Sequence, residues 1–120
     1  PAGKVFVDGY GVGDVGSVVL RDRKHLAEDG MIVVVVSMSG EDGQVISGPD
    51  IITRGFVYVK DNEDLMEAMR IITLSSLEDC QARRIRDRNA IKTDIKNSLS
   101  AFLYKNTKRS PMILPVIMEI

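Results

Sequence analysis

The position of the glycines is the feature that most constrains how this sequence can fold. All ten glycines lie at or before Gly55, and neither glycine nor proline occurs again until Pro111. These two residue types most often mark turns and interrupt helices. The distribution therefore predicts strands and turns in the first half of the chain and uninterrupted helix in most of the second half.

Three segments have the composition of strands. Residues 31–36 form a β-branched apolar run without polar alternation, which is typical of a central strand. After a predicted hairpin turn at 39–43, residues 44–47 and 51–59 continue as strand. Between them lies Gly48-Pro49-Asp50, where we expect a bulge or kink because proline has no amide hydrogen. Residues 112–118 form the last strand, and Pro115 predicts that this strand lies at a sheet edge or carries a bulge.

Two apolar stripes predict two helices. The first helix begins after a cap at Asp61 or Asn62. The stripes consist of Leu65, Met69, Ile72 and Leu77, and of Ile91, Ile95, Leu99 and Phe102. The largely basic residues 81–88 separate them and hold the expected helix break. This order predicts an α+β two-layer sandwich, in which two helices cover one face of a mixed β-sheet of about three to four strands.

Charge is distributed unevenly along the chain. Residues 1–80 carry seven Lys/Arg and fourteen Asp/Glu, whereas residues 81–109 carry nine and two. This asymmetry favours either an anionic partner for the basic part or self-association. The longest apolar run, residues 31–36, is too short to cross a bilayer, and no signal-peptide pattern precedes it. We therefore expect a cytoplasmic protein with no membrane partner.

Residues 11–16 read Gly-Val-Gly-Asp-Val-Gly, the pattern of a dinucleotide-binding turn. A working site also needs a long helix, a second parallel strand and an acidic residue at its end. Here Asp29 precedes the candidate second strand, and Asp14 would place a carboxylate beside the pyrophosphate. We therefore interpret the motif as a flexible glycine-rich turn. A nucleotide-cofactor enzyme is the least favoured alternative.

Metal and nucleophile chemistry find no support in the sequence. One histidine, His25, and one cysteine, Cys80, cannot form a zinc or di-metal site of the usual type. Asp22 and His25 are interpreted as a surface or interface pair rather than a catalytic dyad. Cys80 falls beside the first apolar stripe and is interpreted as a buried, inert thiol. No catalytic, cofactor-binding or metal-binding residue is assigned.

The basic residues Arg84, Arg88, Lys92 and Lys96 recur every fourth position. On a continuous helix they form one ridge, which can follow a phosphate backbone. They are therefore candidate RNA contacts. The other interpretation is a solvated helix face, partly paired with Asp87 and Asp94. The ridge leaves open the alternative of a stand-alone nucleic-acid-binding module.

Five segments together resemble the late part of bacterial ribonuclease J. They are VDGYGVGDVG (7–16), VLRDR (19–23), LAEDGM (26–31), SGPDIITRGFVYV (47–59) and FLYKNTKRSPMILPVIM (102–118). In this order they span nearly the whole chain, and their combination is specific although each one is short.

The resemblance implies a protein with a metallo-β-lactamase catalytic domain, an inserted β-CASP domain, a linker and a small C-terminal domain. Residues 1–27 would then be the glycine-rich linker arm and residues 28–120 the C-terminal domain. The family's zinc-binding motif has no match here, so zinc is expected only in the absent catalytic domain of an exo- and endoribonuclease. The resemblance implies that this part is non-catalytic and supports dimer assembly. Its partners would be a second copy, the catalytic and β-CASP domains, and RNA.

Overall fold

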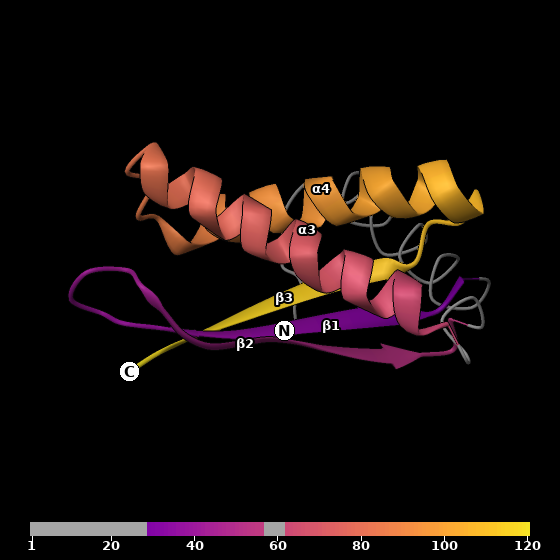
Figure 1. Ribbon diagram of the computed structural model, residues 1–120, viewed down its shortest axis with the longest axis horizontal. Helices are drawn as coiled ribbons and strands as arrows, with labels where there is room; N and C mark the ends of the chain where they lie inside the picture. The colour runs from indigo at the N-terminus through magenta and orange to yellow at the C-terminus, as the bar shows by residue number, and fades with distance from the viewer. Residues whose placement is uncertain (1–28, 57–61) are drawn as a thin grey trace, which may run out of the picture.

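The computed structural model describes residues 29–56 and 62–120. Along the chain they form β1 (Met31–Met38), β2 (Val45–Arg54), α3 (Glu63–Ala82), α4 (Arg88–Thr107) and β3 (Met112–Glu119). Both helices lie on the same side of a three-stranded sheet (Figure 1). The predicted α+β two-layer sandwich is confirmed. The linker arm, residues 1–27, lies outside the described residues.

The sheet has the order β2-β1-β3, so β1 is the central strand as predicted. β2 pairs with β1 in the antiparallel direction after a hairpin in which the Ser39 N–H donates to the Gln44 carbonyl oxygen at 2.8 Å. β3 pairs with β1 in the parallel direction, from Met31 opposite Met112 to Met38 opposite Glu119. A parallel pair needs a long crossover connection, and here α3 and α4 are part of it.

β2 runs through Gly48 and Pro49 without ending. Its pairing with β1 shifts between Val35 and Ser37 and again between Ser37 and Met38, which confirms the irregularity expected at Gly48-Pro49. The strand ends at Arg54, whereas the sequence predicted strand as far as residue 59. It ends there because the chain bends at Gly55, which has a φ of 71°. The predicted continuation over residues 57–59 lies outside the described residues.

Pro115 occupies a position that protects the sheet edge. The N–H groups of Met112 and Ile120 donate to Gly30 and Met38, so the even-numbered residues of this parallel strand direct their N–H groups toward β1. Odd-numbered positions therefore face the outer edge, and Pro115 removes one donor from it. The prediction of an edge strand is confirmed. An edge with a missing donor is a poor template for another strand.

Side-chain caps fix where both helices begin. The Asn62 Oδ1 atom accepts the Leu65 N–H at 3.0 Å, and an Asp87 carboxylate oxygen accepts the Ala90 N–H at 3.0 Å. α3 ends at Ala82, and Arg84 adopts a left-handed φ of 59° in the loop before α4. The helix break therefore lies within residues 81–88, as predicted.

The core lies between the helices and the sheet. β1 directs Ile32, Val34, Val36 and Met38 toward the helices. The buried helix residues include Leu65, Met69, Leu77, Ile91, Ile95, Leu99 and Leu103. Two members of the predicted stripes, Ile72 and Phe102, are only half-buried. The buried residues of α4 recur every fourth position, from Ile91 through Ile95 and Leu99 to Leu103. Leu103 therefore occupies the buried position that was predicted for Phe102.

A small polar network joins α3 to α4. The Ser76 hydroxyl donates to the Asp94 carboxylate at 2.5 Å, and Arg83 lies 2.8 Å from Asp79 and 3.6 Å from Asp94. Cys80 lies beside this network and is 1% exposed. Burial raises the pKa of the Cys80 thiol above its ordinary value, and the negative charge of Asp94 raises it further. The network therefore keeps Asp94 engaged with α3.

Gly30 lies so close to the backbone that follows β2 that we expect no side chain to be tolerated at this position. Gly30 has a φ of +84°, and a Cβ atom there would lie 2.4 Å from the Gly55 carbonyl carbon. We expect Gly30→Ala to lower the free energy of unfolding by about 2 kcal/mol or more in urea titrations. In the control Gly40→Ala, the nearest atom is the flexible Glu119 side chain at 3.4 Å, so we expect a change of about 0.5 kcal/mol or less. Equal losses in both variants would contradict this account.

The environment of Cys80 predicts an unreactive thiol. Because its pKa is raised and its side chain is buried, little accessible thiolate exists near neutral pH. We expect no reaction with a chromogenic disulfide reagent at pH 8 in the folded protein and full reaction in denaturing urea. Rapid labelling of the folded protein would contradict the placement of Cys80 in the core.

Candidate interaction surfaces

Over residues 29–56 and 62–120, the structure contains no group of three or more His, Cys, Asp or Glu side chains that could hold a metal ion. No described helix is long and apolar enough to cross a membrane. The glycine motif at 11–16 and the Asp22–His25 pair lie outside the described residues, so their interpretations stay predictions. Two surfaces of the described part of the chain carry exposed apolar or basic side chains.

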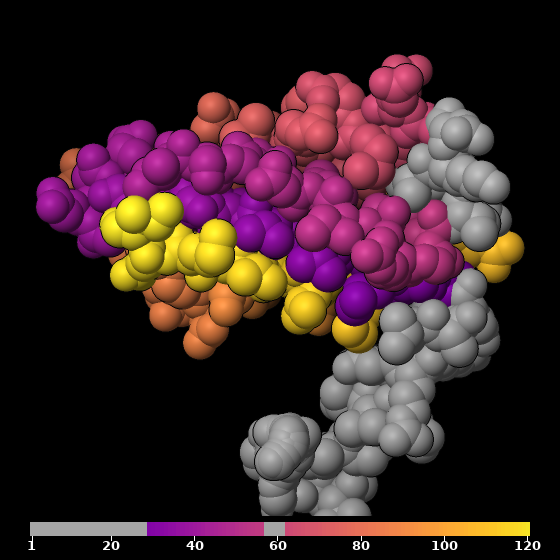
Figure 2. Space-filling model, turned by 90° about the horizontal axis from the view of Figure 1, so that it is seen from below, coloured from indigo at the N-terminus to yellow at the C-terminus, as the bar shows by residue number. Residues whose placement is uncertain are grey.

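The first surface is the face of the sheet opposite the helices, which we call the open face. Figure 2 looks onto it and shows β1, β2 and β3 side by side, with no described helix or strand covering them. Its apolar side chains follow from the alternation along each strand. They are Met31, Val33, Val35, Ile52, Met112, Leu114, Val116 and Met118.

The open face is apolar in its centre and polar along one side. Val33 is paired with both Ile52 and Leu114, each 45% exposed, and Met118 is 48% exposed. The charged residues of this face, Asp50 and Arg54, belong to β2, which is one of the two edge strands. An apolar patch bordered by charged residues is typical of a protein-binding surface rather than of a catalytic site. The uninterrupted apolar run of residues 112–118 was the sequence signal for this second face.

The second surface lies on α4 and contains most of the predicted basic ridge. Arg88, Lys92 and Lys96 are spaced by one helical turn on α4, but Arg84 lies in the preceding loop. The predicted ridge needed all four residues on one continuous helix, and Arg84 therefore does not belong to this row. The Arg88 Nε atom lies 2.8 Å from the Glu119 carboxylate, so this cation is paired within the domain. Lys92 and Lys96 are half-buried and exposed, respectively.

The row continues beyond Lys96 to the end of the helix. The next positions at the same spacing are Ser100, Tyr104 and Lys108. Tyr104 is 55% exposed, and the Lys108 Nζ atom lies 5.3 Å from the centre of its ring. The predicted ridge ended at Lys96, the last residue of the dense basic cluster, and did not include this extension. The continued spacing of four was the signal that could have revealed it.

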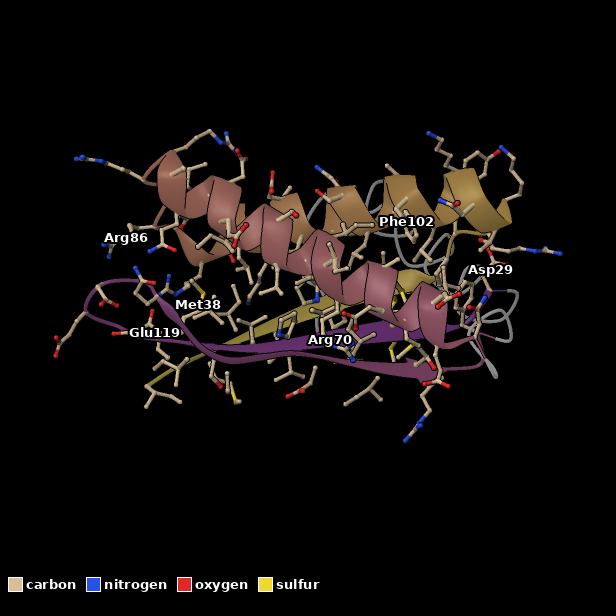
Figure 3. The ribbon with its side chains drawn as sticks, in the orientation of Figure 1. Asp29, Met38, Arg70, Arg86, Phe102 and Glu119 are labelled. Atoms are coloured by element: carbon tan, nitrogen blue, oxygen red, sulfur yellow. The ribbon has the colours of Figure 1, made fainter. Side chains whose placement is uncertain are left out.

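Two arginines connect the helical layer to the sheet at one end of the molecule. Figure 3 shows Arg86, Met38 and Glu119 gathered there, with Asp29 at the opposite end. Arg86 donates to the Glu41 carbonyl oxygen at 3.4 Å, and Arg88 pairs with Glu119 at the end of β3. These contacts fix the start of α4 and therefore the direction of its basic row. At the other end, the Asp29 carboxylate accepts the Ser110 N–H at 2.8 Å, which joins the start of β1 to the turn before β3.

Comparison with known proteins places this architecture in a family. The family described as Ribonuclease J C-terminal domain matches residues 18–120. The chain is 41% identical over 120 residues to Ribonuclease J2 of Bacillus subtilis (strain 168), covering 100% of this chain and 22% of that protein. It is 44% identical over 123 residues to Ribonuclease J 2 of Staphylococcus aureus (strain NCTC 8325 / PS 47), covering 99% of this chain and 21% of that protein.

A third relative agrees with the first two. Ribonuclease J 2 of Staphylococcus epidermidis is 44% identical over 120 residues, which is 99% of this chain and 21% of the relative. The chain thus spans about one fifth of the length of the curated relatives that it matches. The match to the family covers all of the described residues, including all three strands and both helices. The chain belongs to the ribonuclease J family, in which it corresponds to the C-terminal domain.

Proposed function

We propose that this chain is the non-catalytic C-terminal domain of an RNA-degrading hydrolase and that it supports assembly of the enzyme into a dimer. Its relatives are named as ribonucleases, and it matches the domain described as the C-terminal one. In this proposal the cytoplasmic parent enzyme contains zinc-dependent catalytic and β-CASP domains outside this chain. The observation that carries the assembly role is the apolar open face of the sheet.

The occupant of the open face in this proposal is a second copy of the chain. In an interface with a two-fold axis, both subunits use the same surface, so the apolar centre of one open face would pack against the apolar centre of the other. Two twisted sheets can pack face to face with interdigitating side chains. Pairing edge to edge through β3 is disfavoured because Pro115 removes an outward N–H. The geometry therefore favours packing of one open face on another.

The size of the open face sets the expected strength of the contact. An eight-residue strand is about 26 Å long, and three strands are about 14 Å wide, which gives a projected area on the order of 400 Å². A stable interface usually buries about 800 Å² on each partner. We therefore expect the isolated chain to dimerise weakly and with a clear dependence on concentration. The catalytic and β-CASP domains would add the remaining contact area in the whole enzyme.

A second candidate function is RNA binding by the basic row of α4, as a stand-alone activity or as an addition to assembly. The favouring observation is that Lys92 and Lys96 lie two positions from Asp94 and so on the other side of the helix. The Asp94 carboxylate is held by Ser76 on α3 and by Arg83, which caps α3. Lys92 and Lys96 are therefore not neutralised by the acidic residue nearest to them in sequence, whereas Arg88 is paired with Glu119. Lysines without a carboxylate partner attract a phosphate backbone.

The assembly proposal predicts a selective effect of charge on the open face. Leu114→Lys places an ammonium group in the apolar centre, and we expect the variant to be monomeric at concentrations where the unaltered chain dimerises. The matched control is Ile71→Lys, because Ile71 is an exposed apolar side chain on α3 (53%) rather than on the sheet. Light scattering and analytical sedimentation would measure both. A chain that stays monomeric at all concentrations, or a Leu114→Lys variant that still dimerises, would contradict the proposal.

The basic row predicts a position-specific effect on RNA affinity. Replacing Lys92 and Lys96 by Gln removes two cations from the row while keeping high helix propensity. We expect weaker binding and a decrease of about 1.4 in the slope of log affinity against log salt. The control Arg70→Gln with Lys105→Gln removes the same net charge from positions off the row. Equal losses in the two double variants would show that only net charge matters and would reject the row as a site.

A further inference from the structure

The basic row of α4 extends over the whole length of the helix. From Arg88 to Lys108 it contains six positions at a spacing of four residues, and the last one caps the helix. At 1.5 Å per residue, the row is about 30 Å long. Its members are Arg88, Lys92, Lys96, Ser100, Tyr104 and Lys108, and none of them is acidic.

The C-terminal end of this row holds an aromatic ring in a defined position. Lys108 adopts a left-handed conformation with a φ of 60°, and its N–H donates to the Tyr104 carbonyl oxygen at 2.8 Å. In this conformation the Lys108 side chain lies over the ring of Tyr104, and its ammonium group is 5.3 Å from the ring centre. Because the tyrosine is still 55% exposed, the ring keeps a large accessible surface beside a cation.

We infer that the α4 row binds single-stranded RNA, with Lys92 and Lys96 along the phosphates and Tyr104 as a stacking platform for one unpaired base. The inference rests on the proposed function for the choice of RNA as the polyanion. Surfaces that bind single strands combine a cationic track with aromatic rings on which bases stack. The row has both parts, although at 3.6 residues per turn it winds around α4 by about 40° per step, which places Tyr104 about 80° around the helix from Lys96. Lys108 places a further cation next to the stacked base.

The exposed ring is what favours a single strand over other anionic partners. Phosphates of a duplex can reach Lys92 and Lys96, but paired bases are stacked within the helix and do not offer a face to Tyr104. An acidic peptide can also pair with the lysines, yet carboxylates gain little from a phenol ring. Single-stranded RNA uses both the cations and the ring, so it is the occupant to which we commit.

Variants of Tyr104 and Lys108 test this site without disturbing the helix. Tyr104→Ala removes the ring from an exposed position, whereas Tyr104→Phe retains it and removes only the hydroxyl. Lys108→Gly removes the cation and keeps a residue that favours the left-handed cap. The probe is a fluorescein-labelled twelve-nucleotide oligouridine, and its fluorescence anisotropy is measured with the 120-residue chain at several salt concentrations.

We expect Tyr104→Ala to weaken oligouridine binding by about five- to hundredfold, because stacking on one aromatic ring has this effect. Tyr104→Phe should bind within about twofold of the unaltered chain, and Lys108→Gly should decrease the salt slope by about 0.7. An RNA duplex of equal length should bind more weakly and should not distinguish Tyr104→Ala from the unaltered chain.

Three results would overturn the inference. They are unchanged oligouridine affinity in Tyr104→Ala, equal affinity for the duplex, and equally effective competition by polyglutamate, which would instead indicate an acidic protein partner. Light scattering on the same samples separates this site from dimer assembly. The Leu114→Lys variant should lose self-association and keep oligouridine binding, so either proposal can fail while the other holds.

Discussion

The parallel pairing of β1 with β3 is the contact on which the rest of this domain depends. β3 pairs with β1 along its whole length, although the two strands are separated by the hairpin strand and both helices. A parallel connection cannot be made by a tight turn, so α3 and α4 must cross above the sheet. Their apolar stripes then cover Ile32, Val34 and Val36. The same pairing brings Val33 and Leu114 together on the other face, where no described element covers them.

Much of this arrangement could be predicted from local sequence patterns. The β-branched run at 31–36 indicated the central strand, Asn62 was one of the two expected caps, and Pro115 indicated an edge strand. The helix break within 81–88 followed from the loss of apolar periodicity there. These features depend on residues close in sequence, for which periodicity and capping are direct signals.

Other features depend on contacts that a single sequence does not encode locally. The end of β2 at Arg54 follows from the bend at Gly55, and the sequence favoured strand as far as residue 59. Phe102 and Leu103 are adjacent apolar residues, and only the orientation of α4 on the sheet decides that Leu103 is buried. Arg84 failed to join the basic ridge because the helix break fell between it and Arg88. The cap that places Lys108 over Tyr104 also needed three-dimensional geometry.

The two candidate surfaces lie on opposite layers of the domain, so one can be occupied without covering the other. The open face belongs to the sheet, and the basic row belongs to the helix above β3 (Figures 1 and 2). A dimer formed through two open faces would therefore direct both α4 helices outward. In such an assembly, each protomer would present its own cationic row to RNA while its sheet holds the partner.

Nuclear magnetic resonance at increasing protein concentration tests the assembly role most directly, because it reports each face separately. We predict concentration-dependent shifts of the methyl groups of Val33, Val35, Leu114 and Val116, whereas the methyl groups of Ile71 on α3 stay unchanged. Shifts confined to the helical layer, or none at any concentration, would contradict an assembly role for the open face.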